Sequence, residues 1–155
     1  MRGVGNLGHK PAAIYEWSAS KVVNFILQSS DLSLKFFTQK ALFLVLVACG
    51  RRINDTLASV RTPHFLKFSI DKQTLIINYV PGYIFKNDKN SERPTPITWV
   101  RYSEIVRRKG ADGDIRNVND KLCPVKAIEQ YLQATKDSKC SFLFVNPYNV
   151  NNVLY

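Results

Sequence analysis

The stretch ACGRRINDTL, at residues 48–57, separates a long apolar segment from a sheet-forming one. Upstream of it, residues 41–49 form a nearly unbroken apolar run, and Thr38 stands before this run as a candidate helix N-cap. Because the run is apolar on all sides, we expect its helix to be central and buried. Gly50 is a typical residue at the end of a helix. The sequence therefore predicts a central helix that begins near Thr38 and ends at Gly50.

Two arginines follow this predicted helix end, and residues 53–57 are predicted to form a new short helix. An arginine at the end of a buried helix has a rigid base, while its guanidinium can still reach a cleft. The planar guanidinium carries five donors and can hold a phosphate in two places. Arg52 could instead neutralise helix carbonyls or pair with Asp55. We favour the phosphate-binding role for Arg52.

The composition indicates one soluble globular domain. The chain has 155 residues, of which 45% are hydrophobic and 22% are charged, and this excludes a disordered tail. Lysine and arginine number 22 against 12 aspartate and glutamate residues, so the formal net charge is +10. This excess favours a polyanionic partner, most simply nucleic acid. The alternative is a basic protein that has no such partner.

The cysteines indicate neither a metal site nor a disulfide framework. Cys49, Cys123 and Cys140 are odd in number and far apart, and no C-x-x-C pair occurs. We expect a reducing compartment, no metal ion and no small-molecule cofactor. The N-terminus lacks the apolar core of a signal peptide, and the run at residues 41–49 is far shorter than the roughly 20 residues of a membrane span. We therefore expect an intracellular protein that has no membrane partner.

Two further helices are predicted outside the central one. Residues 1–16 are polar, contain glycine and show no period, so we interpret them as a flexible N-terminal arm. The next helix opens at residues 17–18, with Ser18 as its cap, and ends at residues 29–31. Another helix covers residues 122–132, where a proline falls in the first turn.

Alternating apolar and polar residues predict a small sheet. Residues 64–70 and 74–80 would form a hairpin, which places His64 on a strand, and residues 96–100 would add a third strand. The polar region at residues 101–116 is predicted to be a basic loop. A strand-like run at residues 141–145 is followed by an asparagine-rich tail. These elements predict an α+β fold, mainly helical, with a three-stranded antiparallel sheet.

Three segments resemble the tyrosine recombinases, the phage-integrase family. GRRIND at residues 50–55 is similar to the family's box G-x-R-[IV]-[SN]-[ED]. GYIFKN at residues 82–87 is similar to G-[FY]-x-x-K-[NT], and NDKLCPVKAIEQYLQAT at residues 119–135 to [DN]-x-x-L-C-P-V-x-A-[LI]-x-x-Y-L-x-x-T. The sequences of these motifs are most similar to those in the recombinases of DIRS-like and Crypton-like mobile elements. The resemblance covers residues 17–145 and implies a tyrosine recombinase catalytic core.

The resemblance implies roles for single residues. Arg52 matches the first catalytic arginine, and Arg51 takes the variable position before it. Lys86 matches the lysine that acts on the leaving oxygen of the scissile phosphodiester, with Lys89 as the second choice. Fixed cations stabilise the charge that gathers on a phosphodiester under attack, and a lysine can protonate the leaving oxygen. From the loop alone, Lys86 would be a solvated lysine. Further DNA contacts are expected on one positive face, at Arg51, Lys89, Arg107, Arg108 and Lys109, although the last three fit a solvated loop equally well.

Two features of the family are not found after Val145. These are the H-x-x-R box with the second arginine and the tyrosine nucleophile; Tyr148 and Tyr155 lack the preceding box. A covalent phosphotyrosine intermediate requires that nucleophile. We therefore interpret residues 17–155 as a partial catalytic domain that is inactive alone, and whether the chain is an enzyme stays open. Truncation would expose apolar surface around Val45, Phe142 and Phe144.

The expected function is that of a recombinase fragment acting in DNA recombination and DNA integration. The expected partner is DNA, on which copies of the chain could assemble into a homo-oligomer, and the location would be nuclear in a eukaryote. The alternative is a non-enzymatic basic remnant that binds DNA, or an interaction module without a DNA role.

Overall fold

The structure is a computed structural model that describes residues 18–83, 96–109 and 120–154. Among these residues the fold is α+β, with five α-helices and a small three-stranded antiparallel sheet. The N-terminal arm predicted at residues 1–16 lies outside the described residues. The helices are α2 (Ala19–Gln28), α3 (Leu34–Cys49), α4 (Ile53–Leu57), α5 (Tyr102–Lys109), the 3-10 helix η3 (Asp120–Leu122) and α6 (Pro124–Ala134). The strands are β1 (Leu66–Phe68), β2 (Thr74–Ile77), β3 (Ile97–Val100), β4 (Val145–Asn146) and β5 (Asn149–Val153).

Helix α3 begins earlier than predicted. Its N-cap is Ser33, whose backbone is extended and whose hydroxyl accepts a hydrogen bond of 3.2 Å from the amide of Phe36. Thr38 lies inside the helix instead, where its hydroxyl donates to the carbonyl of Leu34 at 2.7 Å. The prediction of Thr38 as the cap was wrong because a cap must hold its backbone outside the helix, and Ser33 does so. The end of α3 at Gly50 is confirmed by a left-handed backbone with φ 63°.

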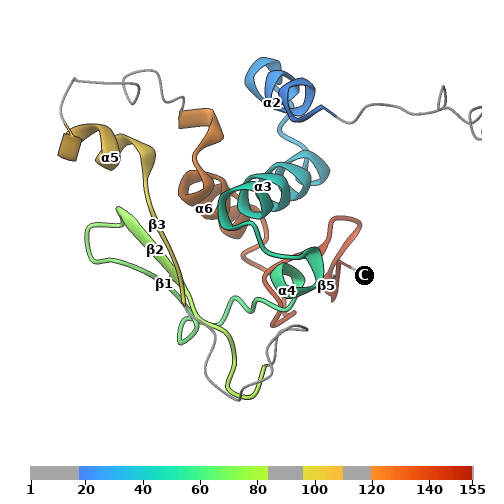
Figure 1. The fold of residues 1–155 in the computed structure, drawn as a ribbon. Coiled ribbons are helices and arrows are strands. Elements are labelled where there is room, and N and C mark those ends of the chain that lie inside the picture. The colour runs from blue at the N-terminus through green and yellow to red at the C-terminus, as the bar shows by residue number, and fades with distance from the viewer. Residues whose placement is uncertain (1–17, 84–95, 110–119, 155) are drawn as a thin grey trace, which may run out of the picture.

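The core lies between α3, α6 and the sheet, and Figure 1 shows α3 at the centre of the fold, against α6. Leu44 and Val45 of α3 and Ile128 and Tyr131 of α6 are all buried. The outer face of α3 is open, since Val47 is 63% exposed. The central position of the helix is therefore confirmed, whereas the expectation that it is buried on all sides was wrong.

The predicted hairpin is confirmed, with shorter strands. Strand β2 is central and pairs antiparallel with both neighbours, Leu66 opposite Ile77 and Thr74 opposite Val100. The turn before β2 contains Lys72 with φ 60°. His64 lies in the turn that precedes β1 rather than on the strand, because the carbonyl of Thr62 accepts the amide of Phe65.

Two segments differ from the predictions made for them. Residues 102–109, predicted as part of a basic loop, form α5, in which the buried Glu104 pairs with Arg107 one turn later. The asparagine-rich tail, for which no element was predicted, contains β5, which pairs with the two-residue strand β4. The contacts in both segments are short in range, an ion pair within one turn of α5 and the hairpin pairing of β5 with β4, and neither was inferred from the residue pattern.

The apolar surface expected from truncation is mostly covered. Val45 is 2% exposed and Phe144 is 1% exposed, because both pack into the core. The ring of Phe144 lies 5.6 Å from that of Tyr131 on α6. Phe142 alone of the three is exposed, at 38%. The expectation was therefore wrong for Val45 and Phe144.

Candidate functional site

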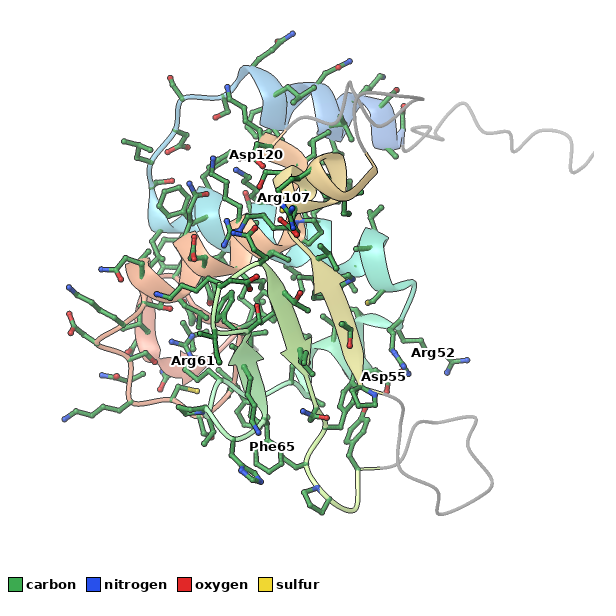
Figure 2. The ribbon with its side chains drawn as sticks, turned by 90° about the vertical axis from the view of Figure 1, so that its left-hand side faces the viewer. Arg52, Asp55, Arg61, Phe65, Arg107 and Asp120 are labelled. Atoms are coloured by element: carbon green, nitrogen blue, oxygen red, sulfur yellow. The ribbon has the colours of Figure 1, made fainter. Side chains whose placement is uncertain are left out.

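Arg52 stands on a fixed backbone at the start of α4, whose predicted bounds are confirmed. Its carbonyl accepts hydrogen bonds from the amide of Thr56 at 3.0 Å and from the Thr56 hydroxyl at 3.2 Å. Thr56 is 1% exposed, so this anchor lies in the protein interior. The side chain of Arg52 is exposed and extends away from the ribbon (Figure 2). Within the described part of the chain it forms no ion pair.

Arg51 turns inward, against an aromatic ring. Its guanidinium carbon lies 5.7 Å from the centre of the Tyr79 ring, which is the distance of a cation–π contact. Tyr79 in turn stacks on Tyr83, with 5.2 Å between the ring centres and 14° between the planes. Arg51 and Arg52 are adjacent in sequence but differ in environment. Arg51 packs on the stacked tyrosines, whereas Arg52 faces solvent.

Asp55 lies in the first turn of α4 and accepts a hydrogen bond from the hydroxyl of Tyr83. Asp55 is only 9% exposed. The pKa of Tyr83 is raised well above its ordinary value, first by burial and then by the hydrogen bond to Asp55 and its negative charge. The alternative in which Arg52 pairs with Asp55 is therefore not what the described residues show. Burial also raises the pKa of Tyr79, and the positive charge of Arg51 opposes this rise.

The remaining predicted site residues lie elsewhere or outside the described part. Lys86 and Lys89 lie outside the described residues. Arg107 is on α5, where its Nε donates to Glu104 at 2.7 Å and its Nη2 donates to the same carboxylate. Arg108 and Lys109 belong to the α5 backbone, and their side chains lie outside the description. Figure 2 shows Arg107 and Arg52 on separate parts of the molecule.

Sequence reasoning missed a structural arginine, Arg61. Its guanidinium donates to the carbonyls of Phe142 at 2.9 Å, Thr135 at 3.0 Å and Leu143 at 2.6 Å. It also lies over the ring of Tyr131 at 5.9 Å. These partners are 74 to 82 positions away, so no local pattern could have found them. Arg61 holds the segment after α4 to the segment after α6.

Sequence analysis also missed the contacts of Tyr79 and Tyr83 with the arginine box, which is the segment at residues 50–55. A signal for the contact of Tyr83 does exist. Asp55 occupies the acidic position of the G-x-R-[IV]-[SN]-[ED] box, and Tyr83 the aromatic position of the G-[FY]-x-x-K-[NT] segment. Both positions appeared only as part of a motif, and their direct contact was not inferred. Tyr79 carries no motif position and reads as an ordinary strand residue.

An apolar pocket of about 340 Å³ lies between α4 and the β4–β5 hairpin. None of the residues that line it carries a titratable side chain, so it does not suit a phosphate. Its lining consists of Asn54, Leu57, Ala58, Phe142, Phe144, Val153 and Leu154.

Within the described ranges, no group of three or more histidine, cysteine, aspartate or glutamate side chains is placed to hold a metal ion. No helix in these ranges combines the length and apolar character needed to cross a bilayer. Comparison with protein-family models, curated proteins and solved structures finds no match to this chain.

Proposed function

We propose that this chain carries the arginine-box part of a tyrosine recombinase catalytic domain, of the DIRS-like or Crypton-like kind, and contacts DNA phosphates in recombination and integration. The observation that carries the proposal is the geometry of Arg52. Its backbone is anchored to the buried Thr56, its side chain is exposed, and the nearby carboxylate of Asp55 is bonded to Tyr83 instead. The backbone of Arg52 is thus fixed, and its exposed guanidinium, which does not pair with Asp55 among the described residues, can donate to a phosphate in two places.

The proposal assigns Lys86 to the same phosphate as a general acid. The last described residue before it is Tyr83, and the hydrogen bond from Tyr83 to Asp55 fastens this end of the described chain to α4. Arg52 and Asp55 lie within one turn of each other at the start of α4. The described geometry is therefore compatible with an arginine and a lysine that act together on one phosphodiester.

The other cations are proposed as supporting DNA contacts that contribute unequally to the binding affinity. Arg51 is half-buried on Tyr79, so its charge would act on DNA from behind Arg52. Arg107 already donates twice to Glu104, which reduces its attraction for a phosphate. Lys89, Arg108 and Lys109 add to the net charge of +10. Binding through such contacts would depend strongly on salt and little on base sequence.

A second candidate function is a non-enzymatic basic module that binds DNA. It is favoured by the net charge of +10, which attracts a polyanion without requiring any catalytic residue. Both candidates predict DNA binding through Arg52, and both predict no covalent protein–DNA adduct when the chain is incubated with supercoiled and nicked DNA, because the fragment is expected to be inactive alone. An adduct would contradict that expectation and would exclude the non-enzymatic module.

The experiment that tests DNA binding is fluorescence anisotropy of a labelled duplex at low salt. Arg52→Gln should weaken binding roughly tenfold, because a charge-assisted contact to a phosphate is lost. Arg52→Lys should fall between the wild type and Arg52→Gln, since it keeps the charge but loses the two-point contact. The matched control is Lys136→Gln, an exposed residue after α6 that loses the same charge. Equal affinities for Arg52→Gln and Lys136→Gln would refute the proposed role of Arg52.

A further inference from the structure

The apolar pocket between α4 and the β4–β5 hairpin is built partly on the helix that Arg52 begins. Arg52 is the N-cap of α4. Asn54, Leu57 and Ala58 line the pocket, and because they are spaced three and four positions apart they share one face of the helical turn. Figure 1 shows α4 beside β5, which supplies Val153 to the lining. The pocket therefore begins within about one helical turn of the backbone that carries the proposed phosphate contact.

The walls of the pocket are apolar, and one of them is fixed by the core. Phe144 is 1% exposed, and its ring lies 5.6 Å from the buried ring of Tyr131. Phe142 and Val153 are 38% and 37% exposed, so the lining reaches the surface through large apolar side chains. The volume of about 340 Å³ falls within the range of about 300 to 1,000 Å³ that is usual for ligand pockets. The pocket can thus take an uncharged ring from outside the protein.

The polar member of the lining is Asn54, which is an exposed residue. Its backbone is fixed, because its carbonyl accepts the amide of Ala58 at 3.1 Å. A side-chain amide donates and accepts hydrogen bonds, and it can hold the edge of a nucleobase in two places. None of the lining residues is charged, which suits an uncharged base. The exposed Arg52, at the start of the same helix, supplies positive charge for the phosphates that flank such a base.

We propose that this pocket binds an unpaired nucleobase of a nucleic-acid strand, with a phosphate of the strand at Arg52. The inference rests on the proposed function for the strand. The base would lie against the apolar walls formed by Phe142 and Phe144, and the amide of Asn54 would bond its edge. Pockets that take a base out of a duplex read it in this way, through hydrogen bonds to its edge and contact with aromatic or apolar side chains. A phenyl ring from a protein partner would fill the same walls but would leave the amide of Asn54 without a partner.

The first test uses two small probes that carry no phosphate. Adenosine presents a base edge, whereas benzyl alcohol presents an aromatic ring alone. In NMR spectra of the isotope-labelled chain, adenosine should shift the amide signals of Ala58 and Leu154 but not that of the exposed Lys136. Adenosine should bind roughly fivefold more tightly than benzyl alcohol, and Asn54→Leu should remove this difference, because leucine keeps the volume and loses the amide. Equal affinities of the wild type for the two probes, or no shift with adenosine, would overturn the base site.

The second test separates the base site from the proposed function. Fluorescence anisotropy compares a labelled single strand with an abasic strand of the same length and charge. The strand that carries bases should bind roughly tenfold more tightly, because one stacked base contributes at least that factor. Ala58→Phe fills the pocket and should abolish this preference, whereas Ala48→Phe, at an exposed position of α3, should keep it. Circular dichroism confirms that both variants are folded.

The outcomes of this comparison differ for the two proposals. If no strand and no duplex binds while adenosine still shifts the signals of the pocket, the proposed function fails and the base site stands. If the wild type binds the abasic strand as tightly as the strand that carries bases, the base site is overturned and the phosphate contact of Arg52 is unaffected.

Discussion

The hydroxyl of Tyr83 donates a hydrogen bond to the carboxylate of Asp55, across 28 positions of sequence. This contact joins the chain that leaves β2 to helix α4, at the last residue of the arginine box. It also supplies the buried Asp55 with a neutral donor. Arg52 therefore does not serve as the partner of this carboxylate, and its guanidinium stays exposed at the surface.

Replacing Tyr83 by phenylalanine should lower the free energy of unfolding by about 1 to 3 kcal/mol, because Asp55 keeps its burial and loses a donor. Urea denaturation followed by circular dichroism measures this change. The control is Tyr148→Phe. Tyr148 is 80% exposed, so the loss of its hydroxyl leaves no buried group without a partner. A Tyr83→Phe variant as stable as Tyr148→Phe would show that the hydrogen bond to Asp55 contributes nothing.

Arg61→Met should destabilise the fold by roughly 2 to 4 kcal/mol, since methionine fills similar space but leaves several carbonyls without their donor. Those carbonyls belong to Thr135, Phe142 and Leu143. Arg61→Lys should recover only part of the loss, because one ammonium cannot reproduce the guanidinium fork. Thermal unfolding of the three proteins measures the order. Wild-type stability for Arg61→Lys would contradict the role of the fork geometry.

Gly50→Ala should cost roughly 1 kcal/mol in the free energy of unfolding, through backbone strain alone. Gly50 has φ 63°, and an added Cβ would meet no atom within 4 Å, so no steric clash contributes. Gly50→Asn should cost less, because asparagine tolerates the left-handed region better than alanine. Urea denaturation of both variants gives the comparison. An alanine variant more stable than the asparagine variant would rule out this explanation.

The tyrosines predict how stability depends on alkaline pH. The pKa values of Tyr79, Tyr83, Tyr102 and Tyr131 are raised above 10.0, in each case chiefly by burial. The folded state therefore holds these protons more tightly than the unfolded state does. Their contribution to stability is complete below about pH 10 and is lost as the pH rises further, toward the folded pKa values.

Absorbance at 295 nm, which reports tyrosinate, measures this effect. The seven tyrosines of the chain should titrate in two phases, with the later phase accompanied by loss of the circular dichroism signal. Tyr83→Phe should reduce the later phase. A single phase near pH 10 with the fold intact would contradict the burial of these hydroxyls.

Local signals in the sequence predicted the elements that hold the arginine box. Gly50 marks the end of α3 because glycine adopts the left-handed backbone without a Cβ penalty, and α4 follows at the predicted residues 53–57. The hairpin of β1 and β2 also follows from local residue preferences, as does the helix predicted at residues 122–132, which is observed as α6 at Pro124–Ala134. In each case the deciding interaction lies within a few residues.

Some features that the sequence did not predict form in polar segments whose local preference is weak. Helix α5 carries an ion pair one turn apart, between Glu104 and Arg107, and strand β5 pairs with β4 across a short hairpin. Ser33 precedes α3 and caps it, whereas Thr38, the predicted cap, lies inside the helix, and the backbone geometry decides between them. The partners of Arg61 and of Asp55 are brought together by the chain topology, which periodicity alone does not reveal.

The phosphate-binding role of Arg52 is tested most directly by the salt dependence of DNA affinity. The logarithm of the association constant is measured against the logarithm of the salt concentration for the wild type, Arg52→Lys and Arg52→Gln. Removing one phosphate contact should make the slope of Arg52→Gln shallower by about 0.9, while Arg52→Lys should keep the slope of the wild type. Equal slopes for the wild type and Arg52→Gln would contradict the assignment of Arg52 as a phosphate contact.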